Sequence, residues 1–197
     1  AAPLLAESAR AWLWLRQGRL ENVKRWAGSL NLNSQSDIAP GNDADLLLLA
    51  QLLIAQNKLP EAATLLQRLI ASTESSEHWL LHLTAQLLRA VVLAAQDKAR
   101  EARQALASVL HRAEPENYVR LFVDAGLPVA RLLYQAIEHD LAPAYARRLL
   151  AAFPQADWSP QPDRVQPIMP PEDLIEPLSD RELEVLRLID QGMSNSE

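Results

Sequence analysis

Apolar residues recur at helical spacing through most of this 197-residue chain, and the pattern repeats. Segments that begin at Gly18, Asn57 and Asp97 align with one another in steps of 39 and 40 residues. Each unit predicts a helix, a tight turn and a second helix. Equivalent positions upstream hold alanine (Ala11, Ala50, Ala90) or a large apolar residue (Trp14, Leu53, Leu93), and those downstream hold Ala27, Leu66 and Leu106, then Leu30, Leu69 and Val109.

The turn position of each unit holds glycine, asparagine or aspartate. These residues tolerate a positive φ best, so we expect a left-handed residue at each turn. The small alanine should allow two helix backbones to approach closely, and the larger residues should fill the space between them. Pro60 stands where the second helix of its unit begins, a position at which proline is tolerated.

The period and the alternation of small and large residues resemble a tetratricopeptide-like (TPR-like) repeat over about residues 4–112. The units are longer than the common form of about 34 residues. The resemblance implies an all-α superhelix of stacked helical pairs, in which the inner helices line a concave groove. An ordinary helical bundle with coincidental spacing is the alternative.

By the same resemblance, a few side chains of the inner helices should face the groove. Trp12 and Arg16 lie one helical turn apart and could stack on, or hydrogen-bond, a small-molecule inducer or a protein partner. The alternative is that they pack against a preceding repeat or a neighbouring helix. Trp14 aligns with Leu53 and Leu93, so we expect it in the core. The candidate groove residues are Trp12, Arg16, Gln51, Thr84 and Val91.

Residues 113–153 follow the repeats and predict further helices, which we interpret as the closing helices of a sensor region. Loops are expected at 31–43 and 72–77, where serine, asparagine and glycine are frequent. Pro115 suits the first turn of a helix over 116–124, and residues 125–128 should break it. A helical pair is expected at 129–138 and 142–152. The stretch 116–126 (ENYVRLFVDAG) resembles the segment that closes the sensor region of large ATP-binding, MalT-like regulators of the LuxR type.

Residues 154–177 contain seven of the thirteen prolines. Proline removes backbone donors and disfavours helix in the residue before it. This composition predicts a linker between the helical region and the last segment, 178–197.

The last segment, 178–197, carries the most specific motif. Ser179 and Glu182 have the spacing of a capping box, an apolar stripe at helical spacing follows, and Gly192 should end that helix. Ser194 opens a second capping box. With Arg181, this pattern resembles the start of a LuxR-type helix-turn-helix domain. The resemblance implies a fragment of a bacterial transcription regulator whose parent is activated by an inducer, with the rest of the domain following Glu197 in that parent.

The charge distribution bears on DNA binding. The chain has a formal net charge of −6, and its last segment contains more acidic than basic residues. Since phosphate contacts by cations supply most DNA affinity, we expect DNA binding only through the complete parent. Self-association is possible for such a parent. The contrasting hypothesis is a TPR-type scaffold for protein–protein interaction with no DNA-binding role.

Other chemistry has little support in the sequence. The five glycines form no phosphate-binding loop, so ATP would bind upstream in the parent. His78 and His82 are four residues apart and could present two metal ligands from one helix face, but structural histidines are the favoured interpretation. We predict no catalytic, cofactor-binding or metal-binding residue and no enzyme activity. Cysteine is absent, which fits a cytoplasmic protein, and no run of apolar residues predicts a membrane span.

Overall fold

The computed structural model describes residues 2–39, 41–73 and 79–153, and the structural statements below concern these residues. They form nine helices and no strand, which confirms the predicted all-α class. The helices are α1 (Ala2–Arg16), α2 (Leu20–Ser29), α3 (Asp43–Ala55), α4 (Leu59–Thr73), α5 (Trp79–Ala95), α6 (Ala99–Ala113), α7 (Arg120–Val123), α8 (Leu127–Glu138) and α9 (Pro143–Ala151). None of these described helices combines the length and apolar character needed to cross a bilayer.

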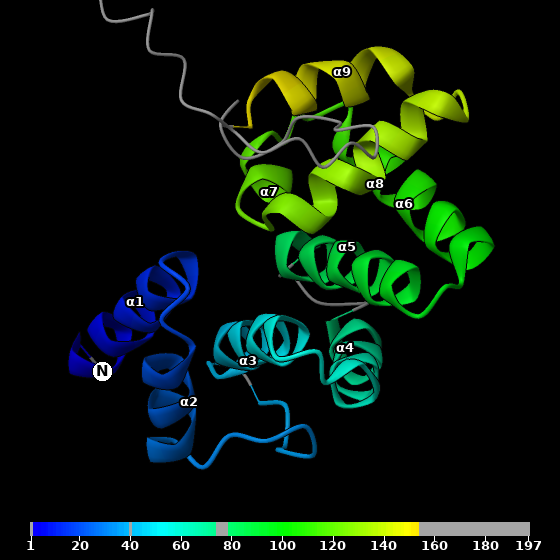
Figure 1. The fold of residues 1–197 in the computed structure, drawn as a ribbon. Coiled ribbons are helices and arrows are strands. Elements are labelled where there is room, and N and C mark those ends of the chain that lie inside the picture. The colour runs from blue at the N-terminus through cyan, green and yellow to red at the C-terminus, as the bar shows by residue number, and fades with distance from the viewer. Residues whose placement is uncertain (1, 40, 74–78, 154–197) are drawn as a thin grey trace, which may run out of the picture. The chain divides into compact units, whose positions relative to one another are not determined.

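The first six helices form three successive antiparallel pairs, as the repeat predicted (Figure 1). The turns within the pairs are short because each first helix ends in the same backbone motif. Gly18, Asn57 and Asp97 have φ values of 70°, 59° and 60°. The next residue donates its N–H to the carbonyl oxygen five positions earlier, at 2.8–3.0 Å. This is the hydrogen bond of a Schellman motif, and it explains the choice of turn residues.

The same motif also ends α2, α6 and α8, which the sequence analysis did not anticipate. Asn31, Asn117 and Asp140 have φ values of 53°, 52° and 56°. The N–H groups of the residues that follow them bond to the carbonyl oxygens of Ala27, Ala113 and Ala136.

The small positions of the repeat are in the core. Ala11, Ala50 and Ala90 are all 0% exposed, and Leu53 and Leu93 are also buried. Trp14 is only half-buried, so the expectation that it belongs to the core is met only in part. The guanidinium of Arg10, 5.3 Å from the Trp14 ring centroid, covers part of that ring.

Two apolar clusters form the core, and α5 contributes to both. One cluster joins α5 to α6, α7, α8 and α9, and the other joins α5 to the preceding helices. Because α5 packs on both sides, buried residues occur around most of its circumference. Leu83 and Leu87 belong to the first cluster, and Ala85 and Leu88 to the second.

The predicted helix over 116–124 is wrong in its extent. Only Arg120–Val123 form a helix, α7. Residues 114–117 instead form the turn that ends α6, because Asn117 adopts a left-handed conformation and the Tyr118 N–H bonds to the Ala113 carbonyl oxygen. Pro115 therefore lies in this turn and not in the first turn of a helix.

The helical pair that follows is confirmed with small shifts. It was expected at 129–138 and 142–152 and is found as α8 and α9. The break expected at 125–128 is shorter, because Leu127 and Pro128 already belong to the first turn of α8. The loop expected at 72–77 was placed two residues too early at its start, because α4 continues through Thr73. The predicted linker, 154–177, and the helix-turn-helix start, 178–197, lie outside the described residues.

A candidate binding groove

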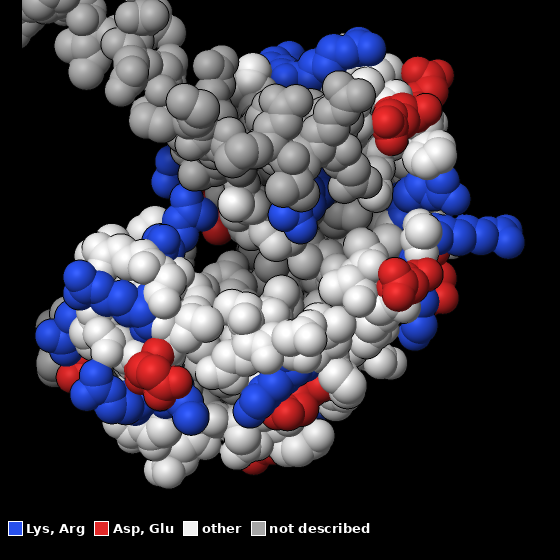
Figure 2. All heavy atoms as spheres, viewed as in Figure 1, with Lys and Arg blue, Asp and Glu red and all other residues white. Residues whose placement is uncertain are grey.

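Two adjoining cavities, each of about 370 Å³, lie between the inner helices and the segment around α7. Helices α1, α3 and α5 form one side, and residues 118–128 form the other. Gln51, Asp124 and Ala125 line both cavities, so we treat the two as one groove. Figure 2 shows a hollow on this face of the molecule, with basic side chains at part of its rim.

The five residues expected in the groove all line it. Trp12, Gln51 and Thr84 line the first cavity, and Arg16, Gln51 and Val91 line the second. Trp12 is 38% exposed, whereas Val91 is buried and forms part of the apolar wall of the second cavity. Whether these side chains contact a ligand stays a prediction, but their convergence follows from the repeat.

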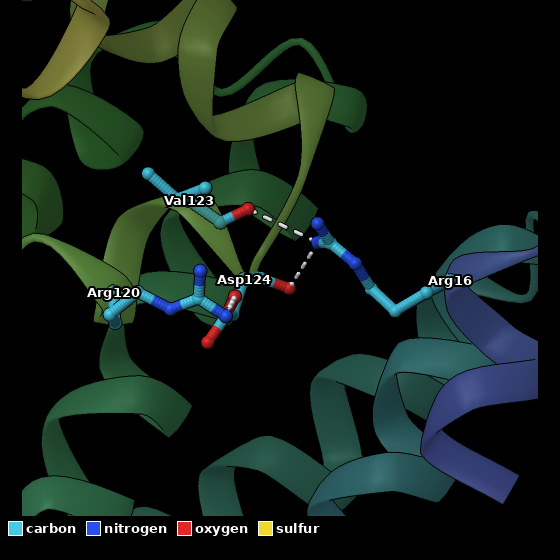
Figure 3. Close-up of polar contacts among 4 residues, drawn as sticks. All are labelled: Arg16, Arg120, Val123 and Asp124. Carbon is cyan, nitrogen blue, oxygen red and sulfur yellow. Dashed lines mark hydrogen bonds and ion pairs between the residues drawn. The ribbon is translucent and has the colours of Figure 1, made fainter. Parts of the chain in front are cut away.

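Arg16, the last residue of α1, spans the groove (Figure 3). Its Nη1 donates hydrogen bonds to the carbonyl oxygens of Val123, at 3.1 Å, and Asp124, at 3.0 Å. Its guanidinium carbon also lies 5.9 Å from the centroid of the Trp12 ring. Arg16 thus contacts a neighbouring helix, the second of the two possibilities that the sequence left open, and it places positive charge at the C-terminal end of α7.

The sequence did not indicate the α7 side of the groove. The stretch 116–126 carries a family resemblance, but nothing in its local pattern indicates that it faces α1. Asp124 lines both cavities, and its Oδ1 lies 2.9 Å from Nη2 of Arg120 in an ion pair. The Arg120 side chain is 76% exposed and that of Asp124 is 31% exposed. Tyr118 and Leu121 complete this side of the first cavity.

Two polar groups in the first cavity differ in their capacity to bind. The Thr84 hydroxyl donates a hydrogen bond to the Leu80 carbonyl oxygen within α5, at 2.7 Å. The Thr84 hydroxyl oxygen can therefore only accept a hydrogen bond from a ligand. Gln51 is half-buried, and its amide supplies both donors and an acceptor. With the Trp12 and Tyr118 rings nearby, the cavity combines aromatic surface with a few polar groups, as small-molecule sites do.

Tyr145 of α9 holds the start of the α7 segment. This residue is fully buried, and its hydroxyl lies 2.9 Å from the Tyr118 carbonyl oxygen and 3.3 Å from that of Ala113. Its ring packs edge-on against Phe122 of α7. Burial raises the pKa of the Tyr145 phenol to about 12, and nearby Arg148 opposes this shift. The neutral phenol is therefore the form that the fold favours.

Exposed apolar side chains gather at the edges of the groove. Trp12 and Leu80 line the first cavity, and Leu127 lines the second. Trp79 packs edge-on against Tyr118, with ring centroids 5.1 Å apart. These four side chains are 38–46% exposed.

His82 has a structural environment. It is 8% exposed, and its Nδ1 lies 3.1 Å from the Thr73 hydroxyl, which donates to the Leu69 carbonyl oxygen. Its Nε2 lies 2.9 Å from the Gln86 amide nitrogen. Both ring nitrogens are therefore engaged by protein groups. His78 lies outside the described residues, and no cluster of three potential metal ligands occurs among those described.

Successive helix–turn–helix pairs with a left-handed residue at each turn, small residues at the helix contacts and a groove along the inner helices define a TPR-type repeat protein. The family model of the MalT-like TPR region matches residues 1–139. The chain therefore belongs to the MalT-like TPR family. The match extends through α8 and includes the whole α7 segment. No significant match was found among curated proteins or solved structures.

Proposed function

We propose that this chain is the sensor part of a LuxR-type transcription regulator and that its groove binds a small-molecule inducer. The carrying observation is that all five residues assigned to the groove from the repeat line two joined cavities. The match to the MalT-like TPR region supports the regulator context. We assign no catalytic step to the groove.

The cavities favour a small, partly polar molecule. Trp12 and Tyr118 offer ring surface, and Gln51 and Thr84 offer uncharged hydrogen-bonding groups. Of the two acidic residues that line the first cavity, Asp124 is paired with Arg120, and the other is Asp45. A ligand with hydroxyl or amide groups would use these partners without bringing an unpaired charge into the cavity.

DNA binding belongs to the complete parent in this proposal. The motif with Ser179, Arg181 and Glu182 would begin the helix-turn-helix, and Gly192 and Ser194 would lie between its first two helices. In this fold the second helix enters the major groove and reads base edges. ATP would bind to an upstream part of the parent in the cytoplasm, and nucleotide and inducer together would control self-association.

A protein partner in the groove is the second candidate, as in a TPR-type scaffold without a DNA role. The observation that favours it is the set of exposed apolar side chains at the groove edges, because such patches mark interaction sites. A peptide would use this rim, whereas a small inducer would use the cavity walls.

The DNA-binding assignment is tested by measuring duplex binding at two salt concentrations, with the 197-residue chain and with a parent that contains the complete helix-turn-helix domain. The parent should bind promoter DNA with an affinity that falls steeply as salt rises. The 197-residue chain should bind weakly or not at all. Tight, sequence-specific binding by that chain would contradict the assignment, and so would no binding by the parent in the presence of ATP and inducer.

A further inference from the structure

The first helical pair has fewer fully buried side chains, among those described, than the two pairs that follow it. Among the α1 side chains whose surroundings are described, residues 7–16, only Ala11 is buried. Helix α2 adds Val23, Trp26 and Ala27 to the same core cluster. By contrast, α5 contributes buried residues to both clusters. Half-buried apolar residues in and beside α1 and α2 also pack on the cluster that contains Ala11: Trp14, Leu15, Leu20, Leu30 and Leu32. Because it has fewer fully buried side chains, we expect the pair formed by α1 and α2, here called the arm, to separate from its neighbours at a lower cost than α5.

A polar contact far along the chain supplements this apolar one. Arg16 is separated by 107 residues from Val123 and by 108 from Asp124, whose carbonyl oxygens accept its hydrogen bonds. These carbonyls lie at the end of α7. The Val123 carbonyl oxygen also accepts the Gly126 N–H, at 3.1 Å. Gly126, two residues after Asp124, has a φ of 85° and allows the sharp turn into α8.

We propose that Arg16 and the carbonyl oxygens of Val123 and Asp124 form a clasp that opens and closes the groove by moving the α1–α2 arm relative to α7. The donor is an exposed cation and the acceptors are two neutral backbone oxygens. The bond to Asp124 is exposed and open to replacement by water, whereas the bond to Val123 is partly buried. The hydrogen bonds of the clasp therefore favour the closed groove but do not prevent it from opening.

The position of the clasp connects it to both cavities. The Arg16 guanidinium lies over Trp12, which lines the first cavity, and Arg16 itself lines the second. Asp124 lines both. A molecule that contacts both walls of the groove binds the closed form more tightly, and occupancy and clasp closure then favour each other. The movement itself requires no ligand, so this inference does not depend on the proposed inducer.

The clasp can be tested by measuring the distance between α1 and α8. The chain contains no cysteine, so Ala9→Cys and Gln135→Cys, both at exposed positions, would carry the only two nitroxide labels. Pulsed electron paramagnetic resonance would then report the distance distribution in the full 197-residue chain. Arg16→Gln removes the cation, and we expect a broader distribution with more long distances. Arg16→Lys keeps the positive charge but replaces the planar guanidinium with an ammonium group. It should therefore broaden the distance distribution less than Arg16→Gln does.

Arg10→Gln is the matched control. Arg10 is an exposed arginine of the same helix, but it lies over Trp14 and not against α7. This variant should retain the parent distribution. If Arg16→Gln also retains it, or if Arg10→Gln broadens it equally, the clasp does not control the groove.

A second variant covers the case in which Arg16→Gln does not fold, as judged by circular dichroism. Gly126→Ala leaves α1 intact but is strained at a φ of 85°, so it should displace the carbonyls that accept from Arg16. A broadened distance distribution in folded Gly126→Ala supports the clasp. If the distribution is unchanged both in Gly126→Ala and in Arg16→Lys, the clasp proposal is wrong. Since no ligand is added, these outcomes are separate from any failure of the groove to bind an inducer.

Discussion

The hydroxyl of Tyr145 lies 2.9 Å from the carbonyl oxygen of Tyr118 and donates a hydrogen bond to it. This bond joins α9 to the residues that lead into α7, and α7 forms the far wall of the groove. The wall is therefore positioned by contacts on two elements: Tyr145 from α9 and Arg16 from α1.

Tyr145→Phe should weaken this positioning. The substitution keeps the ring contact with Phe122 but leaves the Tyr118 carbonyl oxygen without its donor. We expect the free energy of unfolding to fall by about 0.5–1.5 kcal/mol, the net value of one hydrogen bond. Urea denaturation with an unchanged slope would measure this loss. A variant midpoint equal to that of the parent would show that the bond does not stabilise the fold.

The same residue predicts a dependence on alkaline pH. The folded-state pKa of about 12 is above the ordinary value of 10.0, so the fold favours the neutral phenol. Its contribution is complete below about pH 10 and is lost as the pH rises toward 12. The parent should therefore lose stability more steeply than Tyr145→Phe over this interval, as measured by urea midpoints at each pH. Parallel losses would mean that Tyr145 does not titrate with unfolding.

The turn residues can be tested at Asn57. With a φ of 59°, Asn57→Ala should destabilise the protein by about 1–2 kcal/mol, because a Cβ without a compensating side chain disfavours the left-handed region. Asn57→Gly relieves that strain and should stay close to the parent. Thermal unfolding of both variants provides the measurement. Equal destabilisation by alanine and glycine would indicate a side-chain role and not a backbone one.

Close helix packing can be tested at Ala50, which is fully buried. Ala50→Leu, or the equivalent Ala90→Leu, should cost about 1–3 kcal/mol through overpacking. Ala71→Leu, at an exposed position of α4, is the matched control and should have little effect. If the core and surface variants have the same denaturation midpoint, the repeat alignment does not describe the helix contacts.

The sequence predicted the features that depend on short-range chemistry. A turn residue that tolerates positive φ and a small residue seven positions before it identify each pair, and both signals are local. The α7 wall could not be predicted in this way. Its helix is four residues long, Asn117 interrupts the apparent helical spacing, and its contact with Arg16 joins residues more than a hundred positions apart. The groove was thus predicted from one side only.

The most direct test of the groove as a sensor is a thermal-shift screen of small polar metabolites on the 197-residue chain. A molecule that binds the native state raises the apparent melting temperature. We predict that an active compound shifts the parent and Leu13→Ala, an exposed α1 variant that does not line the groove, but not Trp12→Ala or Gln51→Ala. A compound that shifts the groove variants as much as the parent, or the absence of any active compound in a broad screen, would contradict the account.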